Sequence, residues 1–171
     1  TPVIFMFVMN SFPAGLSFYY FVSNLVTIGQ QLAIRKFVNE DKIKFIANPS
    51  DRKIVEFVFQ HHRENVEPIL PKLRKQIIHN DANDRNVLVQ NNKVSGIIDF
   101  GDASCTQLIN ELAIGITYAI LEKENPLEWA VPIISAYNKI LPLEEKEIDV
   151  LYWLIAARLC ISVCNSAYEK S

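Results

Sequence analysis

The side chains that could carry chemistry are concentrated in one polar stretch. Residues 79–86 read His-Asn-Asp-Ala-Asn-Asp-Arg-Asn and combine an imidazole with carboxylates and carboxamides. Asp99 follows Asn86 by thirteen residues, within the run Ile-Ile-Asp-Phe-Gly-Asp. A carboxamide oxygen and a carboxylate are hard ligands that suit Mg²⁺, which also takes ligands from substrate phosphates. The spacing predicts Asn86 and Asp99 as a pair of metal ligands.

A second carboxylate, that of Asp81, is placed to act as a general base. It lies on the loop that leads into the predicted metal pair, and the metal does not need it. Such a carboxylate can accept the proton of an attacking hydroxyl. A loop rich in Asn and Asp often only turns the chain, because these side chains hydrogen-bond their own backbone. The apolar strand that ends in Asp-Phe-Gly favours the catalytic interpretation, since base, metal ligand and metal ligand then follow in the order that phosphoryl transfer uses.

A β-hairpin between the two motifs would bring them together. Residues 87–89 and 94–98 are apolar and flank a polar turn at 90–93, which predicts two antiparallel strands. Because a hairpin returns the chain to the end at which it started, Asn86 and Asp99 should lie close together. The apolar pair Ile77-Ile78 and the hairpin strands are expected to pack on both sides of the polar loop and to hold it rigidly.

Helices account for most of the remaining chain. The run Asn-Pro-Ser-Asp at 48–51 is typical of a helix start, and Pro68 and Pro71 are expected to end that helix. The segment 108–121 is apolar nearly all round and should form a buried helix. Further elements are predicted as a strand at 3–9 and helices at 18–37, 127–141 (kinked or divided at Pro132) and 144–168. The fold class is therefore α+β and mostly helical.

The composition excludes several other classes of protein. Half of the 171 residues are hydrophobic and 21% are charged, which is enough to bury a core. The net charge of −2 and the absence of a basic run argue against nucleic acid as a partner. No two of the five glycines are separated by a single residue, so no G-x-G-x-x-G loop is present. Three cysteines suggest no disulfide framework, and we expect a reducing, cytoplasmic setting.

The pattern His79-x-Asp81-x-x-x-x-Asn86, followed by Asp99-Phe-Gly-Asp, resembles the aminoglycoside phosphotransferase and choline kinase superfamily, which is related to the protein kinases. The wording IIHNDANDRNVLV…GIIDFGD is most similar to the hydroxylysine kinase branch. The resemblance extends from about residue 45 onward. It implies a protein-kinase-like C-terminal lobe with a catalytic-loop β-hairpin.

The resemblance also implies roles for single residues and for ligands. Asp81 would be the catalytic base, Asn86 and Asp99 would bind Mg²⁺, and His79 would support the loop. ATP or GTP would be the co-substrate, and a small hydroxylated amine or amino acid such as hydroxylysine would accept the phosphate. Because acids of the C-terminal helices bind cationic substrates in this superfamily, Glu111 becomes a candidate substrate ligand.

Three further polar side chains have competing interpretations. Asp102 could contact metal or substrate, or could cap the following helix. Asp84 fits a hydrogen bond within the loop better than a chemical role. Arg158 lies in an apolar helix, where an unpaired ion would be costly, and is expected to pair with a carboxylate of the loop.

The domain organisation predicted from the resemblance is incomplete. Residues 1–15 would be the remnant of a hinge strand, and residues 16–171 the C-terminal lobe. The N-terminal lobe, with its phosphate-covering loop and its Lys–Glu pair, is absent from the sequence. We therefore expect a piece of a two-lobe kinase that is inactive, or nearly so, by itself.

Two alternatives to a small-molecule kinase stay open. A lone kinase-like lobe could serve as a non-catalytic binding module. The chain could also be tethered to a membrane through residues 3–28, since no charged residue precedes Arg35. The unbroken apolar run is only residues 3–9, whereas a membrane-spanning helix needs about 20 apolar residues. A membrane partner is therefore disfavoured.

Overall fold

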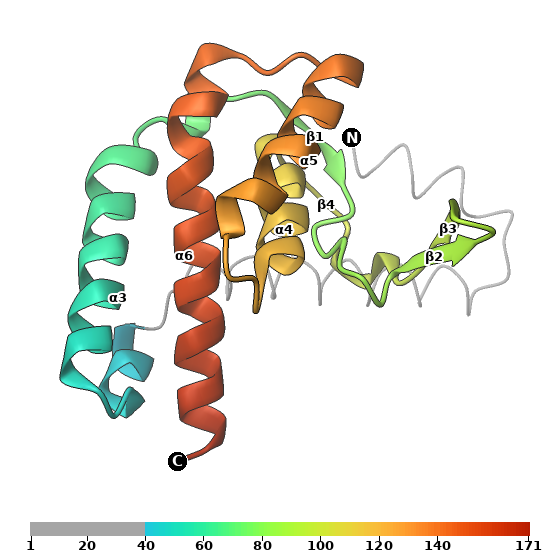
Figure 1. Cartoon of the computed structure of the whole chain (residues 1–171). Helices are drawn as coiled ribbons and strands as arrows, with labels where there is room; N and C mark the ends of the chain where they lie inside the picture. The colour runs from blue at the N-terminus through green and yellow to red at the C-terminus, as the bar shows by residue number, and fades with distance from the viewer. Residues whose placement is uncertain (1–39) are drawn as a thin grey trace, which may run out of the picture. The chain divides into compact units, whose positions relative to one another are not determined.

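A computed structural model of the chain describes residues 40–171 (Figure 1). The chain divides into two units, Thr1–Asn39 and Glu40–Ser171, and everything below concerns the second. The strand predicted at 3–9, the helix predicted at 18–37 and the hinge-strand remnant lie outside the described residues. The described elements are η1 (Glu40–Phe45), α3 (Pro49–His61), η2 (His62–Val66), η3 (Leu70–Lys72), β1 (Lys75–Ile78), β2 (Val87–Gln90), β3 (Lys93–Ile97), η4 (Phe100–Asp102), β4 (Ser104–Gln107), α4 (Ile109–Ile120), α5 (Pro126–Ile140) and α6 (Glu145–Glu169).

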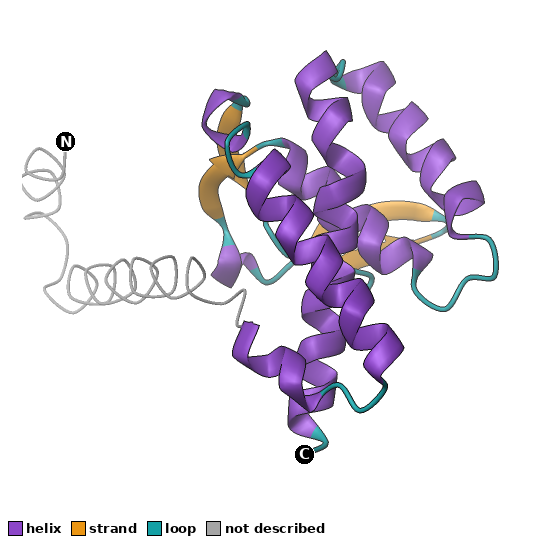
Figure 2. Ribbon diagram, turned by 90° about the vertical axis from the view of Figure 1, so that its left-hand side faces the viewer, coloured by secondary structure: helices purple, strands orange, loops and turns teal. Residues whose placement is uncertain are grey.

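The α6 helix is the longest described element, and other helices pack along both halves of it (Figures 1 and 2). The half nearer its N-terminus shares an apolar cluster with α4 and α5, which includes Ile109, Ile116 and Val150. The other half shares a second cluster with α3 and η1, which includes Phe59 and Cys160. The order and approximate ends of the helices confirm the prediction of a mostly helical α+β chain.

The start of α3 confirms the capping prediction. The Asn48 side-chain oxygen accepts a hydrogen bond from the backbone N–H of Ser50 at 2.9 Å, and Pro49 is the first helical residue. Proline suits this position because the first N–H groups of a helix have no partner within it. The helix continues as a π-helical turn to Val66, so it ends just before Pro68 as predicted.

The α4 and α5 helices differ in how much of their surface is covered. Half of the α4 residues are buried and none is exposed, as its apolar sequence predicts. The α5 helix continues through Pro132, so it is not divided there, and a kink at this residue stays a prediction. The proline deprives the Glu128 carbonyl of its helical partner, and Glu128 is exposed, so water can replace that hydrogen bond.

Four short strands form two antiparallel pairs. The predicted hairpin is confirmed as β2–β3, and Asn91 and Asn92 form its two-residue turn with φ of 51° and 57°. Asparagine tolerates this left-handed conformation better than most residues, which explains the turn. Only the β1 side of the β1–β4 pair, in which Ile78 lies opposite Ser104, was indicated by the sequence, through the apolar Ile77-Ile78. The β4 side was not predicted, because its polar sequence carries no strand signal.

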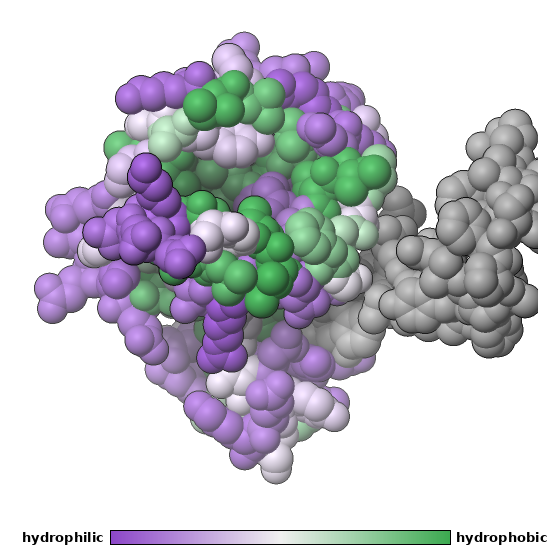
Figure 3. Space-filling model, turned by 90° about the vertical axis from the view of Figure 1, so that its right-hand side faces the viewer, coloured by the Kyte–Doolittle hydropathy of each residue, from purple (hydrophilic) through white to green (hydrophobic). Residues whose placement is uncertain are grey.

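The strands do not enclose the polar loop as expected. Ile77 is 75% exposed, and Val89 and Val94 of the hairpin are each about two-thirds exposed. The face that carries the hairpin accordingly gathers apolar side chains around a hollow (Figure 3). Hydrogen bonds, rather than packing on both sides, hold the loop between β1 and β2.

A buried ion pair ties β1 to α6. Arg74, the residue before β1, donates two hydrogen bonds to Glu147, one of them at 3.0 Å from Nε, and Glu147 is fully buried. Burial alone would raise the pKa of Glu147, but the hydrogen bonds from Arg74 and from the Glu144 backbone N–H lower it below its ordinary value. Glu144 and Glu147 also form a capping box that starts α6.

Among residues 40–171, no helix has both the length and the apolar character needed to cross a membrane.

Candidate active site

His79 connects the two polar motifs. Its Nε2 donates to the backbone carbonyl of Ile98 at 2.9 Å, and its Nδ1 accepts from the backbone N–H of Asp81 at 3.3 Å. Because a carbonyl can only accept, these contacts place the ring proton on Nε2. The ring is nearly buried and lies against Phe100, with 4.8 Å between ring centroids. His79 therefore joins the loop of Asp81 to the residue before Asp99.

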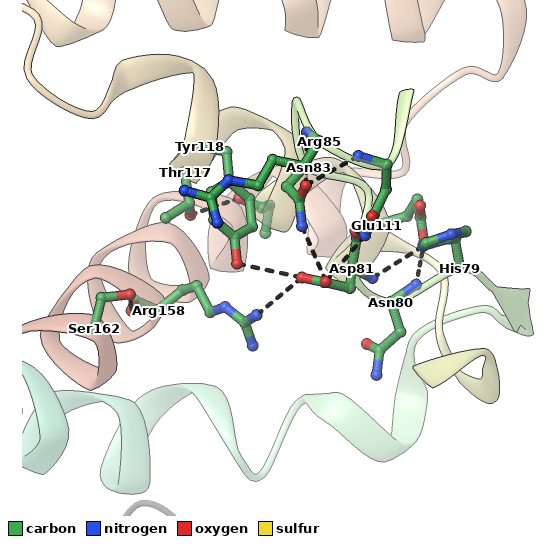
Figure 4. Close-up of polar contacts among 12 residues, drawn as sticks. His79, Asn80, Asp81, Asn83, Arg85, Glu111, Thr117, Tyr118, Arg158 and Ser162 are labelled. Carbon is green, nitrogen blue, oxygen red and sulfur yellow. Dashed lines mark hydrogen bonds and ion pairs between the residues drawn. The ribbon is translucent and has the colours of Figure 1, made fainter. Parts of the chain in front are cut away.

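The two carboxylate oxygens of Asp81 have different neighbours (Figure 4). Oδ2 accepts from the side-chain amides of Asn83 at 3.0 Å and Asn86 at 3.2 Å. Oδ1 accepts from the Tyr118 hydroxyl at 3.2 Å and forms an ion pair with Arg158 Nη2 at 3.7 Å. The carboxylate is thus oriented by four side chains, and its Oδ1 faces the helices α4 and α6.

Asn86 is oriented by its amide group. Its Nδ2 donates to the backbone carbonyl of Asp81 at 2.9 Å as well as to Asp81 Oδ2. With both hydrogens directed at Asp81, the amide oxygen is left free to accept or to bind a cation. The backbone N–H of Asn86 donates to Asn83 Oδ1 at 3.1 Å, so the loop turns on side-chain hydrogen bonds.

Asp99 follows the hairpin after one intervening residue, Ile98, at the end where Asn86 precedes the hairpin. The backbone N–H of Ile98 donates to the Asn86 carbonyl at 2.9 Å, so the hairpin closes at its base. Asp99 itself is left-handed, with φ of 63° and ψ of 65°, and is exposed. A side chain at Gly101 would lie 3.3 Å from Asp99 Oδ1, so glycine leaves room for this carboxylate.

These donors fit a magnesium ion that shares its coordination with a nucleotide. The protein offers a free carboxamide oxygen on Asn86 and an exposed carboxylate on Asp99. Mg²⁺ is commonly bound by one or two such groups, with phosphates and waters completing the octahedron. In the described part of the chain, no group of three or more His, Cys, Asp or Glu side chains forms a metal site. Asn86 and Asp99 would thus supply only part of a coordination shell.

The other predicted site residues lie in three different settings. Glu111 Oε2 accepts from the backbone N–H of Asn80 at 2.9 Å, so Glu111 supports the loop where Asn80 is left-handed with φ of 68°. Its role as a substrate ligand stays a prediction. Asp84 is exposed in the loop, and Asp102 is exposed at the end of η4, which follows Asp99 directly. The pairing predicted for Arg158 is confirmed, and its partner is Asp81.

Sequence reasoning missed Tyr118 and the role of Asn83. Tyr118 lies on α4, where its aromatic ring looked like one more apolar core residue, and only its hydroxyl reaches Asp81. Asn83 holds Asp81 with its amide and the backbone N–H groups of Arg85 and Asn86 with its oxygen. An Asn three residues before a predicted ligand was a usable signal for such an Asx turn.

Comparison with known proteins divides the chain in two. The model of the family described as "Phosphotransferase enzyme family" matches residues 35–148. The model of the family described as "60Kd inner membrane protein" matches residues 1–42. A membrane protein insertase YidC of Amoebophilus asiaticus is 74% identical over 43 residues, which are 25% of this chain and 7% of the insertase. No solved structure matches the chain.

The relatives of the larger part are kinases. A hydroxylysine kinase of Danio rerio is 41% identical over 122 residues, which are 68% of this chain and 34% of that protein. A hydroxylysine kinase of Mus musculus is 34% identical over 133 residues, 72% of this chain and 35% of that protein. The chain spans about a third of the length of these curated relatives. Its motifs at residues 79–86 and 98–102 and the family match over residues 35–148 together show that the chain belongs to the phosphotransferase enzyme family, the aminoglycoside phosphotransferase superfamily.

Proposed function

We propose that this chain carries the catalytic loop and the metal-binding segment of a small-molecule kinase. The enzyme would transfer the γ-phosphoryl group of ATP or GTP to the hydroxyl of a small amine or amino acid. Hydroxylysine is the first candidate acceptor, because the kinase relatives carry that name. Support comes from the family match and from the geometry around Asp81.

One observation carries the proposal: the amide of Asn86 donates to the carboxylate of Asp81. That contact holds the predicted base beside one predicted metal ligand, and the hairpin base brings Asp99 to the same end. A base and two ligands in fixed positions suit phosphoryl transfer, in which the protein mainly positions groups and stabilises charge. A loop rich in Asn and Asp that only turned the chain would not require Asp81, Asn86 and Asp99 to lie at the same end of the hairpin.

The transfer step follows from these positions. The acceptor hydroxyl lies against Asp81, and its oxygen forms a bond to the γ-phosphorus. The bond from that phosphorus to the bridging oxygen breaks, and the nucleoside diphosphate leaves with the electron pair. The carboxylate of Asp81 accepts the proton of the hydroxyl. Mg²⁺, held by Asn86 and Asp99, would neutralise negative charge on the nucleotide phosphates.

His79 and Glu111 support this step through the loop. His79 links the Asp81 backbone to Ile98, and Glu111 holds the N–H of Asn80. Both contacts fix the backbone on either side of the base. Misplacement of a reacting group by about 1 Å can cost roughly a hundredfold in rate, so these supports matter for turnover.

Nucleotide binding tests the proposed metal pair directly. Titration of ATP and GTP into the 171-residue chain should show binding that requires Mg²⁺. Asp99→Ala should lose this dependence, and Asp81→Asn should keep it, because Asp81 is not a ligand. Asp149→Asn, an exposed change on α6, is the matched control. Binding that is equal with and without Mg²⁺, or unchanged in Asp99→Ala, would refute the pair.

Turnover of the chain by itself is expected to be close to background. Its kinase relatives are about three times as long as the part that matches, and phosphoryl transfer also uses a phosphate-covering loop and a Lys–Glu pair. Radiolabelled nucleotide with hydroxylysine as acceptor measures this. Substantial transfer that is abolished by Asp81→Asn would show that the chain is sufficient; substantial transfer that survives Asp81→Asn would remove Asp81 as the base.

A second candidate function is a membrane-tethered protein, and the match of residues 1–42 to an inner membrane protein family favours it. Residues 3–28 would then attach the phosphotransferase part to a lipid bilayer. Fractionation of cells that express the chain tests this. Recovery in the membrane fraction after a high-salt wash supports the tether, and recovery in the supernatant overturns it.

A further inference from the structure

The α6 helix brings a cation to the predicted base. Arg158 Nη2 lies 3.7 Å from Asp81 Oδ1, and the two side chains are 35% and 24% exposed (Figure 4). The Tyr118 hydroxyl donates to the same oxygen. Arg158 thus lies beside Asp81 Oδ1, the carboxylate oxygen that accepts no hydrogen bond from the loop amides.

The ion pair leaves the guanidinium largely uncommitted. The distance of 3.7 Å between Arg158 Nη2 and Asp81 Oδ1 is longer than a hydrogen bond. The five N–H donors of the guanidinium therefore make no hydrogen bond to Asp81. Within residues 40–171, Asp81 is the only side-chain partner of this guanidinium. The planar fork of an arginine is suited to bind a carboxylate through two parallel hydrogen bonds.

The acceptor must lie next to this arginine. Asp81 Oδ2 already accepts two hydrogen bonds, from Asn83 and Asn86, whereas Oδ1 accepts one, from Tyr118, so the oxygen with a lone pair left for an acceptor hydroxyl is Oδ1. A molecule whose hydroxyl contacts Oδ1 is then within a few ångströms of Arg158. A cation in that place attracts an anionic group of the acceptor.

We infer that Arg158 determines acceptor specificity by binding a carboxylate of the acceptor. The acceptor is then a hydroxylated amino acid, and not an amino alcohol that lacks a carboxylate. This inference rests on the proposed function and names the acceptor class of the same site. The competing role of Arg158, neutralising Asp81 as a structural partner, would affect all acceptors equally.

A matched pair of acceptors separates these roles. Hydroxylysine and the diamine formed by its decarboxylation share the hydroxyl and both amines, and differ only in the carboxylate. Each is titrated into the 171-residue chain in the presence of Mg²⁺ and ATP, and isothermal titration calorimetry measures binding in the wild type and in every variant. The variants are Arg158→Gln and Arg158→Lys, and Lys146→Gln removes one positive charge from an exposed position of the same helix as a control.

The wild-type chain should bind hydroxylysine roughly tenfold to a hundredfold more tightly than the diamine, as expected for charge-assisted hydrogen bonds. Arg158→Gln should remove this preference, Arg158→Lys should keep part of it, and Lys146→Gln should leave it intact. Equal wild-type affinities, a preference that survives Arg158→Gln, or binding of neither compound would overturn the inference.

Failure of this inference and failure of the proposed function give different results. The wild-type comparison needs no variant, so it stays decisive even if Arg158→Gln does not fold. Nucleotide binding that depends on Mg²⁺ and Asp99, together with equal affinity for the two acceptors, would retain the kinase and reject Arg158 as its specificity residue. Loss of Mg²⁺-dependent nucleotide binding would reject the kinase site itself.

Discussion

The ion pair between Arg74 and Glu147 gives a prediction in which the loss of stability depends on which partner is removed. The pair anchors the start of β1, and therefore the loop that follows it, to the first turn of α6. The side chain of Arg74 is 32% exposed, whereas that of Glu147 is 1% exposed. Arg74→Met should therefore destabilise the chain more than Glu147→Gln.

The magnitudes follow from what each substitution leaves behind. Arg74→Met leaves a carboxylate buried without its cation, which costs about 3–5 kcal/mol in comparable pairs. Glu147→Gln leaves an arginine that can turn toward water. The amide oxygen of the new glutamine can still accept one hydrogen bond. The expected cost is about 1–3 kcal/mol, that of an impaired buried hydrogen bond. The gap between the two variants should be about 2 kcal/mol at neutral pH.

The pH dependence of the stability difference between the wild type and Arg74→Met gives an independent test. Because the pKa of Glu147 in the folded chain lies below its ordinary value of 4.5, the pair contributes its full stability above that value. This contribution is lost as the pH falls through the folded-state pKa. In Arg74→Met, burial without a cation raises the pKa of Glu147, so protonation relieves the penalty. The difference between wild type and Arg74→Met should shrink as the pH falls from 7 toward 3.

Urea unfolding measures both effects. Trp153 on α6 stacks on His61 of α3, so its fluorescence reports separation of the two helices. Unfolding curves at several pH values for the wild type, both variants and Lys139→Gln, an exposed control on α5, give the free energies. A larger loss in Glu147→Gln than in Arg74→Met, or a difference that does not change with pH, would refute the burial argument.

Three further predictions concern single side chains. Asn48→Ala should remove the cap of α3 and lower the free energy of unfolding by about 1 kcal/mol, as measured by urea unfolding. Gly101→Ala should displace the Asp99 carboxylate and weaken Mg²⁺-dependent nucleotide binding without lowering the melting temperature appreciably, which calorimetry and thermal denaturation check together. One of the three cysteines should react with a thiol reagent in the folded chain at pH 8: Cys105 is exposed, whereas Cys160 and Cys164 are buried, and burial raises the pKa of the Cys160 thiol to about 11.

Local sequence determined the ends of the main elements because their signals act over a few residues. Asn48 and Pro49 mark the start of α3, and two asparagines mark the turn of the hairpin. A hairpin also converts sequence spacing into proximity, so the approach of Asn86 and Asp99 could be predicted without the fold. The family could also be predicted from the motifs at residues 79–86 and 98–102, because their residue types and spacing are visible in the sequence itself.

The tertiary structure alone decided what surrounds Asp81 on its other side. Tyr118 and Arg158 come from two helices that pack beside the loop. The charge of Arg158 in an apolar helix predicted a loop carboxylate as its partner, but only the fold makes Asp81 that partner, and Tyr118 carries no local signal for its contact. The β1–β4 pairing likewise joins segments whose own sequences predict little, since Ser104–Gln107 is polar. Such contacts depend on the angle and rotation at which α4 and α6 pack, and those follow from the whole apolar core rather than from spacing along the chain.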